Sequence, residues 1–132
     1  MSILIDDALT QAFIDGSFGL PIAHENQHYS PTAGTAYAEI FVAPNPKFAY
    51  SLSETDITSG VFRVILRYPT DEGAITAKQK AEEIIAAYPI SSLVTAGAQS
   101  ARITQVTRDK GYPEEGWFKL VVTIFYEAFI AR

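Results

Sequence analysis

Two stretches of the chain repeat their apolar residues with the spacing of an α-helix. In residues 3–13, apolar side chains recur three and four positions apart, behind Ser2 as the expected N-cap. In residues 75–88 they recur in the same way until Pro89, which a helix interior does not tolerate. The pattern predicts two amphipathic helices, one at each of these places.

Five other runs alternate apolar with polar residues, which is the period of a half-buried β-strand. They are residues 37–42, 48–52, 62–68, 101–103 and 118–130. We therefore expect an α+β fold, with a mostly antiparallel or mixed β-sheet and both helices packed on one of its faces. No linker, repeat or low-complexity stretch interrupts the pattern, so residues 1–132 are expected to form a single domain.

The last run carries apolar residues on both of its faces. Its even positions, from Phe118 to Ile130, are all apolar and are assigned to the core. Its odd positions mix aromatic and aliphatic side chains with Lys119 and Glu127, and Val61 and Ile65 similarly alternate with arginines. A face of that composition is typical of a protein interface. The interface candidates on these two runs are Trp117, Val121, Phe125, Phe129, Arg63 and Arg67. The alternative is that the first helix or the long segment before residue 37 covers this face within the same chain.

Residues 16–36 have neither period and contain Pro21 and Pro31. Connections within compact domains are usually about 4–6 residues long, so a segment of this length is expected to be functional or laid against another surface. We expect contacts from a neighbouring subunit to order part of it. Glu25, Asn26 and Tyr29 are therefore further candidates for the subunit interface.

His24-Glu25-Asn26-Gln27-His28 matches the H-E-x-x-H pattern of zinc hydrolases. In those enzymes a helix brings both imidazoles to one metal, and the glutamate is the base for the zinc-bound water. Here the match lies between two prolines, no apolar period supports a helix, and no convincing third ligand follows. An extended surface segment with two unrelated histidines is the favoured interpretation. A small zinc-dependent hydrolase is the alternative from another class of function.

Composition narrows the function further. The chain has no cysteine, which excludes disulfides, thiolate metal sites and thiol nucleophiles and suits a reducing compartment. The net charge of −5 opposes binding to the phosphates of DNA, so no sequence-specific nucleic-acid binding is expected. No apolar run fits a secretory signal or a membrane span, and synthesis and assembly in the cytoplasm are expected. No phosphate-binding glycine loop or nucleophile elbow occurs, so neither an enzyme nor a cofactor is expected. Four acids are expected to be solvated in loops: Glu54, Asp56, Glu114 and Glu115.

A series of short motifs resembles the phage tail-terminator family. The N-terminal part has Pro21-Ile22-Ala23, then Glu25-Asn26, Tyr29, Pro31 and Gly34, before a strand that opens at Tyr37 and ends at Pro44. Later, Gly60-Val61-Phe62 leads a strand ending at Tyr68-Pro69, and Gly73 precedes an alanine-rich helix and a long final strand. The resemblance extends from about residue 21 to residue 129. His24 and His28 stand where the family pattern has no histidine.

The resemblance implies a structural virion protein without catalytic residues. It implies a homo-oligomeric ring, of six subunits in lambda-like terminators, which caps the tail tube at its head-proximal end and stops tube polymerisation. The implied partners are the tail tube protein and the head-tail connector or neck protein, with DNA passing through the lumen and no membrane involved. Another tail or neck protein, such as a tube subunit or a head-tail completion protein, is the nearest alternative.

Overall fold

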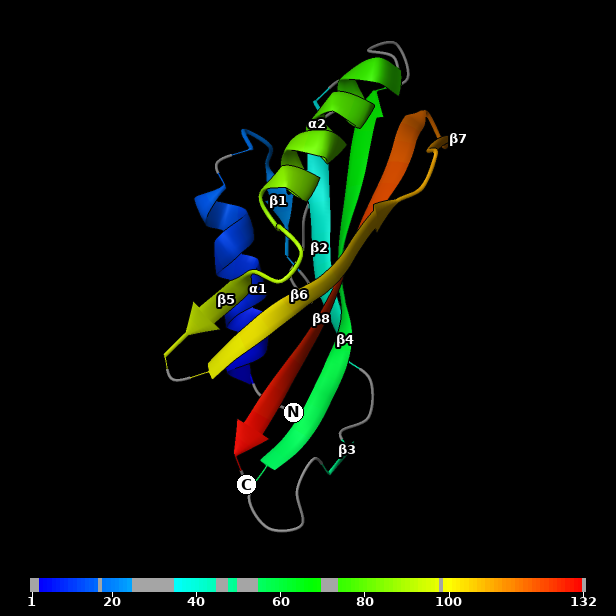
Figure 1. Cartoon of the computed structure of the whole chain (residues 1–132). Helices are drawn as coiled ribbons and strands as arrows, with labels where there is room; N and C mark the ends of the chain where they lie inside the picture. Colours follow the sequence, from blue (N-terminus) through cyan, green and yellow to red (C-terminus); the bar gives the residue numbers. More distant parts are fainter. Residues whose placement is uncertain are drawn as a thin grey trace.

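The computed structural model describes residues 3–16, 18–24, 35–44, 48–49, 55–69, 74–97 and 99–131 (Figure 1). In this part of the chain the helices are α1 (Ile3–Asp15) and α2 (Ala74–Ala86). The strands are β1 (Ile22–Ala23), β2 (Tyr37–Pro44), β3 (Phe48–Ala49), β4 (Thr55–Pro69), β5 (Leu93–Ala96), β6 (Gln99–Arg108), β7 (Tyr112–Glu114) and β8 (Trp117–Ala131). Both predicted helices are therefore confirmed.

The described strands form one sheet in the order β1-β2-β4-β8-β6-β5, with β3 beside β4 and β7 beside β8. Every pairing is antiparallel except the short parallel contact of β1 with β2. Both helices lie on the same side of the sheet (Figure 1). The expected α+β fold, a mostly antiparallel sheet with two helices on one face, is confirmed.

The core lies between this sheet face and the two helices. The even positions of β4 and β8 oppose one another in register, and the pairs Phe62↔Ile124 and Leu66↔Leu120 are fully buried. Each helix buries one stripe against them, as the apolar period predicts. These stripes are Ile5, Leu9 and Phe13 on α1, and Ala77, Ala81 and Ile84 on α2. The assignment of the even positions of the last strand to the core is confirmed from Leu120 to Ala128, and Phe118 is partly buried against the core. The side chain of Ile130 lies outside the described part.

The structure corrects the strand predictions in several places. The strands β1, β5 and β7 were not predicted, because runs of two to four residues are too short to show a period. β4 begins at Thr55, so Asp56 lies in a strand and not in a polar turn. β6 continues to Arg108 through a bulge between Ile103 and Gln105, which shifts the buried positions from odd to even and hides the alternation. Residues 50–52 of the second predicted run lie outside the described residues.

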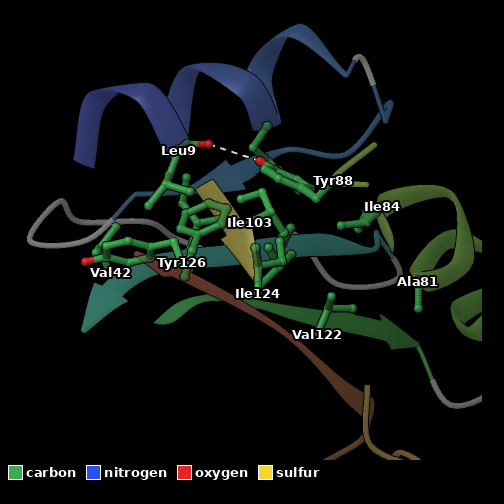
Figure 2. Packing of buried hydrophobic residues seen from close by; sticks show 14 of the residues in the cluster. Leu9, Val42, Ala81, Ile84, Tyr88, Ile103, Val122, Ile124 and Tyr126 are labelled. Carbon is green, nitrogen blue, oxygen red and sulfur yellow. Dashed lines mark hydrogen bonds between the residues drawn. The ribbon is translucent and has the colours of Figure 1, made fainter. Parts of the chain in front are cut away.

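Tyr88 joins the two helical segments across the core. Its side chain, just after α2, is 1% exposed, and its hydroxyl donates a hydrogen bond to the backbone carbonyl of Leu9 in α1 at 3.0 Å (Figure 2). Burial raises the pKa of this phenol far above its usual value. Burial, with a smaller contribution from the negative charge of Asp6, raises the pKa of Tyr126 to about 12. Loss of the proton from either hydroxyl therefore destabilises the folded state.

The folded protein should lose stability in alkali, and Tyr88→Phe should reduce that loss. A phenol with a raised pKa in the folded state retains a proton that the unfolded chain releases above about pH 10, so the free energy of unfolding falls as the pH rises from there. At neutral pH the variant should be about 1 kcal/mol less stable, because it lacks the hydrogen bond to Leu9. Urea unfolding at pH 7 and at several values above pH 10 measures both effects. Tyr112→Phe, which alters a largely exposed tyrosine, is the control and should change neither. An alkaline loss in Tyr88→Phe equal to that of the unaltered protein would contradict this account.

Candidate functional site

The face of the sheet opposite the helices is the candidate site, and we call it the second face. Its residues on the three central strands include Phe41, Val61, Arg63, Ile65, Arg67, Trp117, Lys119, Val121, Thr123, Phe125, Glu127 and Phe129. Neither helix contacts it, because α1 and α2 both pack on the even positions of the sheet. The second face therefore consists of the odd positions of the two longest strands, β4 and β8, as the alternation in the sequence predicts.

The middle of the second face is apolar and only half-buried. Phe125 lies opposite Val61 across the β4–β8 ladder, and Val121 lies opposite Ile65. All four side chains are of intermediate exposure. Neighbours across the strands cover part of each side chain, and the rest faces outward. This is the state expected of a surface that a second molecule can bury further.

The remaining candidates of the predicted interface lie at different parts of this face. Trp117 lies at one end, where its ring meets that of Tyr37 edge-on with centroids 5.3 Å apart. Phe129 lies at the other end and is 49% exposed. Arg63 is exposed between them and makes no ion pair with any other residue that the structure describes. Glu25, Asn26 and Tyr29 fall outside the described residues.

The alternative that the same chain covers this face is wrong for the first helix, which packs on the opposite side. The described part of the long segment also packs toward the helix side, since Phe18, Leu20 and Ile22 all contact the core cluster. Neither the first helix nor the described part of that segment therefore lies on this face. Residues 25–34, also part of that segment, lie outside the described residues.

Charged side chains near the Trp117 end form a network within the subunit. Arg67 donates a hydrogen bond to Glu39, and its Nη1 lies 3.6 Å from Glu114 Oε1. The Nζ of Lys119 lies 3.5 Å from the other oxygen of Glu114. Burial acts to lower the pKa of Arg67, but the hydrogen bond and charge of Glu39 outweigh it and the pKa is raised. Two arginines of similar sequence context therefore differ: Arg67 is paired inside the subunit, whereas Arg63 is not.

This network also corrects a sequence-based expectation. Glu114 was expected to be a solvated loop acid, but it lies in β7 and pairs with two cations, Arg67 of β4 and Lys119 of β8. Its partners are 47 and 5 residues away along the chain, and the first is brought close only because β4 and β7 both pair with β8. No local sequence signal predicts such a contact.

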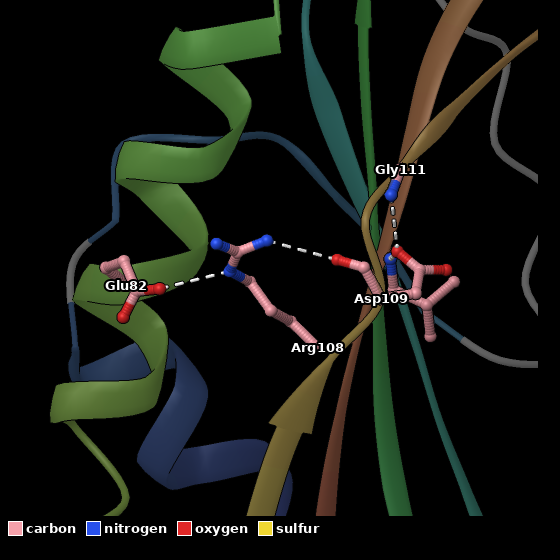
Figure 3. Close-up of polar contacts among 5 residues, drawn as sticks. Glu82, Arg108, Asp109 and Gly111 are labelled. Carbon is pink, nitrogen blue, oxygen red and sulfur yellow. Dashed lines mark hydrogen bonds and ion pairs between the residues drawn. The ribbon is translucent and has the colours of Figure 1, made fainter.

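The connection from β6 to β7 is held in a defined shape. The carboxylate of Asp109 accepts hydrogen bonds from the backbone N–H groups of Gly111 at 3.0 Å and Val121 at 3.1 Å (Figure 3). Arg108 pairs with Glu82 of α2 at 3.0 Å and thereby ties the end of β6 to that helix (Figure 3). Gly111 has a φ of +78°, and a Cβ there would meet the ring of Phe118. The connection is thus fixed by side-chain contacts on both sides.

The H-E-x-x-H match does not lie on a helix where the structure describes it. His24 follows β1 directly and is not helical, while Glu25 and His28 are outside the described residues. Among the described residues, no three histidine or acidic side chains come together in a way that could hold a metal. None of the described helices is long and apolar enough to cross a membrane.

The fold of this chain is also found in other proteins. One solved structure matches with a TM-score of 0.70 at 21% sequence identity, covering 93% of this chain and 94% of its own. At that identity the likeness shows the fold alone. No curated protein matches the chain.

The match to a protein family is more informative. The model of the phage tail terminator protein family matches residues 4–126, which is nearly the whole chain. The resemblance expected from the short sequence motifs is thereby confirmed. Proteins of this family are structural components of the virion and not enzymes, which leaves the zinc-hydrolase alternative without support. A match of this extent shows that the chain belongs to the phage tail terminator protein family.

Proposed function

We propose that six copies of this chain form a ring that caps the head-proximal end of the phage tail tube. The ring would stop tube polymerisation, because it presents no surface to which another tube subunit can add. Its outer side would then join the head connector or neck protein. The single observation that carries the proposal is the half-buried apolar second face on a subunit of a phage tail family.

The second face has the features required of a subunit contact. Its centre is aliphatic and aromatic, with Val121 and Phe125 half-buried, and Phe129 extends the apolar surface to one end. A stable contact buries about 800 Å² on each partner, which a sheet face of this length can provide. Arg63 is free to pair across the contact, whereas Arg67 is already paired and can be covered without losing a partner.

A ring also requires that each subunit use two different patches. Heterologous contacts close into a ring when their rotation divides a full turn, and the second face would be one of the two patches. The net charge of −5 would let DNA pass through the lumen without binding to it.

A pair of neighbouring substitutions tests whether the second face is an interface. Phe125→Glu places a charge on the second face, where the free subunit leaves it in contact with water; assembly should fail because association would desolvate the charge. Ile124→Glu, one residue earlier, places the same charge in the core and should lower the free energy of unfolding by several kcal/mol. Thermal melting and light scattering measure the two effects. Collapse of the melting temperature in Phe125→Glu, or normal assembly of that variant, would contradict the assignment.

The mass of the assembled species tests the ring. Each subunit has a mass of 14.5 kDa, so six copies give 6 × 14.5 = 87 kDa. Light scattering over a concentration series, with and without tail tubes, should show a species of about this mass in at least one condition. A chain that stays monomeric even on tube ends would exclude the proposal.

A further inference from the structure

The sheet has an open edge at β5 that no described strand covers. β5 is the last strand in the order of the sheet, and beside it lies α1 (Figure 1). The N–H of Ile103 donates to the carbonyl of Ser92, and the carbonyl of Ile103 accepts from the N–H of Ser91. Hydrogen-bonded positions alternate along an antiparallel pair, so the backbone groups of Val94, opposite Ala101, point toward β6. The backbone groups of Leu93 and Thr95 therefore point away from the sheet. No described residue pairs with them.

This edge also lacks three sequence features that commonly protect an edge strand. Edge strands commonly carry a charged residue, a proline or a bulge that prevents another strand from adding. β5 has the sequence Leu-Val-Thr-Ala, without any of these, and Leu93 is 59% exposed. An unprotected edge in a protein of an assembling family is suited to strand addition.

The space beside the edge is large enough for an extended segment. Two hollows of about 450 Å³ each lie between α1 and β5, and they share Gln11 and Thr95 as lining residues. A third hollow, of about 270 Å³, lies on the other side of β5 between Leu93 and Phe129. A strand added here could place alternate side chains toward the two sides.

The α1 side of the groove is acidic. Asp15 lines one hollow and Asp7 lines the other, both are exposed, and they lie about 12 Å apart along the helix at 1.5 Å per residue. Asp15 is in the last turn, where the helix dipole disfavours a negative charge, and its described partner is the neutral amide of Gln11. The groove is therefore complementary to a cation.

One cation of this chain lies on backbone that can add to an edge. The described cations without an ion pair are Arg63, Lys78, Arg102 and Lys110. Arg63 and Arg102 lie on strands that are paired on both sides, and Lys78 lies on a helix. Lys110 lies in the connection between β6 and β7, which no described strand covers on its outer side and which Asp109 fixes in shape.

We propose that the β5 edge and its acidic groove receive the β6–β7 connection of a second copy of this chain, with Lys110 directed toward Asp15. The inference rests on the proposed ring and adds to it a contact between two different patches, the β5 edge of one subunit and the β6–β7 connection of the next. Strand pairing would provide the backbone hydrogen bonds of the contact, and the charge pair would fix its register.

A proline substitution tests the strand pairing. Thr95→Pro removes an outward N–H that the β5–β6 ladder does not use, so the subunit should fold while self-association weakens about tenfold or more. Thr95→Val is the matched control, because it keeps the N–H and removes only the hydroxyl that contacts Ser100 at 2.8 Å. Sedimentation and thermal melting measure both properties. Assembly of Thr95→Pro at the strength of the unaltered chain would overturn the proposal.

A charge reversal tests the partner and does not depend on how Thr95→Pro folds. Asp15→Lys should raise the melting temperature, since it relieves the repulsion at the end of α1, yet weaken association about two- to tenfold at low salt. Lys110→Asp should also weaken association, and the double reversal should restore it. A double variant no better than the single ones would overturn the pairing of these two residues.

Crosslinking distinguishes failure of this contact from failure of the ring. Because the chain has no cysteine, Asp15→Cys and Lys110→Cys introduce single thiols. Oxidation of a mixture of the two variants should give a dimer of about 2 × 14.5 = 29 kDa that neither variant gives alone. Rings of 87 kDa without this crosslink would overturn the β5 contact alone. The absence of any self-association would overturn both proposals.

Discussion

The long antiparallel pairing of β4 with β8 is the constraint on which the rest of the structure depends. The two strands are paired without a register shift from Thr55↔Ala131 to Pro69↔Trp117, so every second side chain of both points to the same side. One side is largely apolar and the other is mixed. A register shift of one residue would exchange them and place charged side chains against the helices.

This constraint determines where the other elements can lie. The helices α1 and α2 bury their stripes on the uniform side, and Tyr88 fixes their spacing by its hydrogen bond to Leu9. Among the described residues, neighbours in the β-strands cover the apolar side chains of the mixed side only in part. The assembly surface that we propose is thus a consequence of how the core is built: the same alternation produces both faces.

The long helices and strands could be predicted from the sequence, and the short strands could not. Thirteen-residue helices and the 15-residue β8 repeat their pattern often enough to be recognised. β5 has four residues, and the bulge after Ile103 breaks the alternation of β6, so the sheet edge on which the further inference depends was not visible in the sequence. The candidate site shows the same division. The alternation of Val121 and Phe125 indicated the second face, whereas the pairing of Arg67 with Glu39 and Glu114 depends on contacts between distant strands.

The central claim is that the protein occupies the end of the tail tube. Electron microscopy of tail tubes assembled in its presence, with the protein carrying an electron-dense label, tests this claim most directly. We expect label at one end of each tube, together with tubes that no longer grow when more tube protein is added. Label distributed along the tubes, as expected of a tube subunit, or unlabelled tubes that continue to grow, would contradict it.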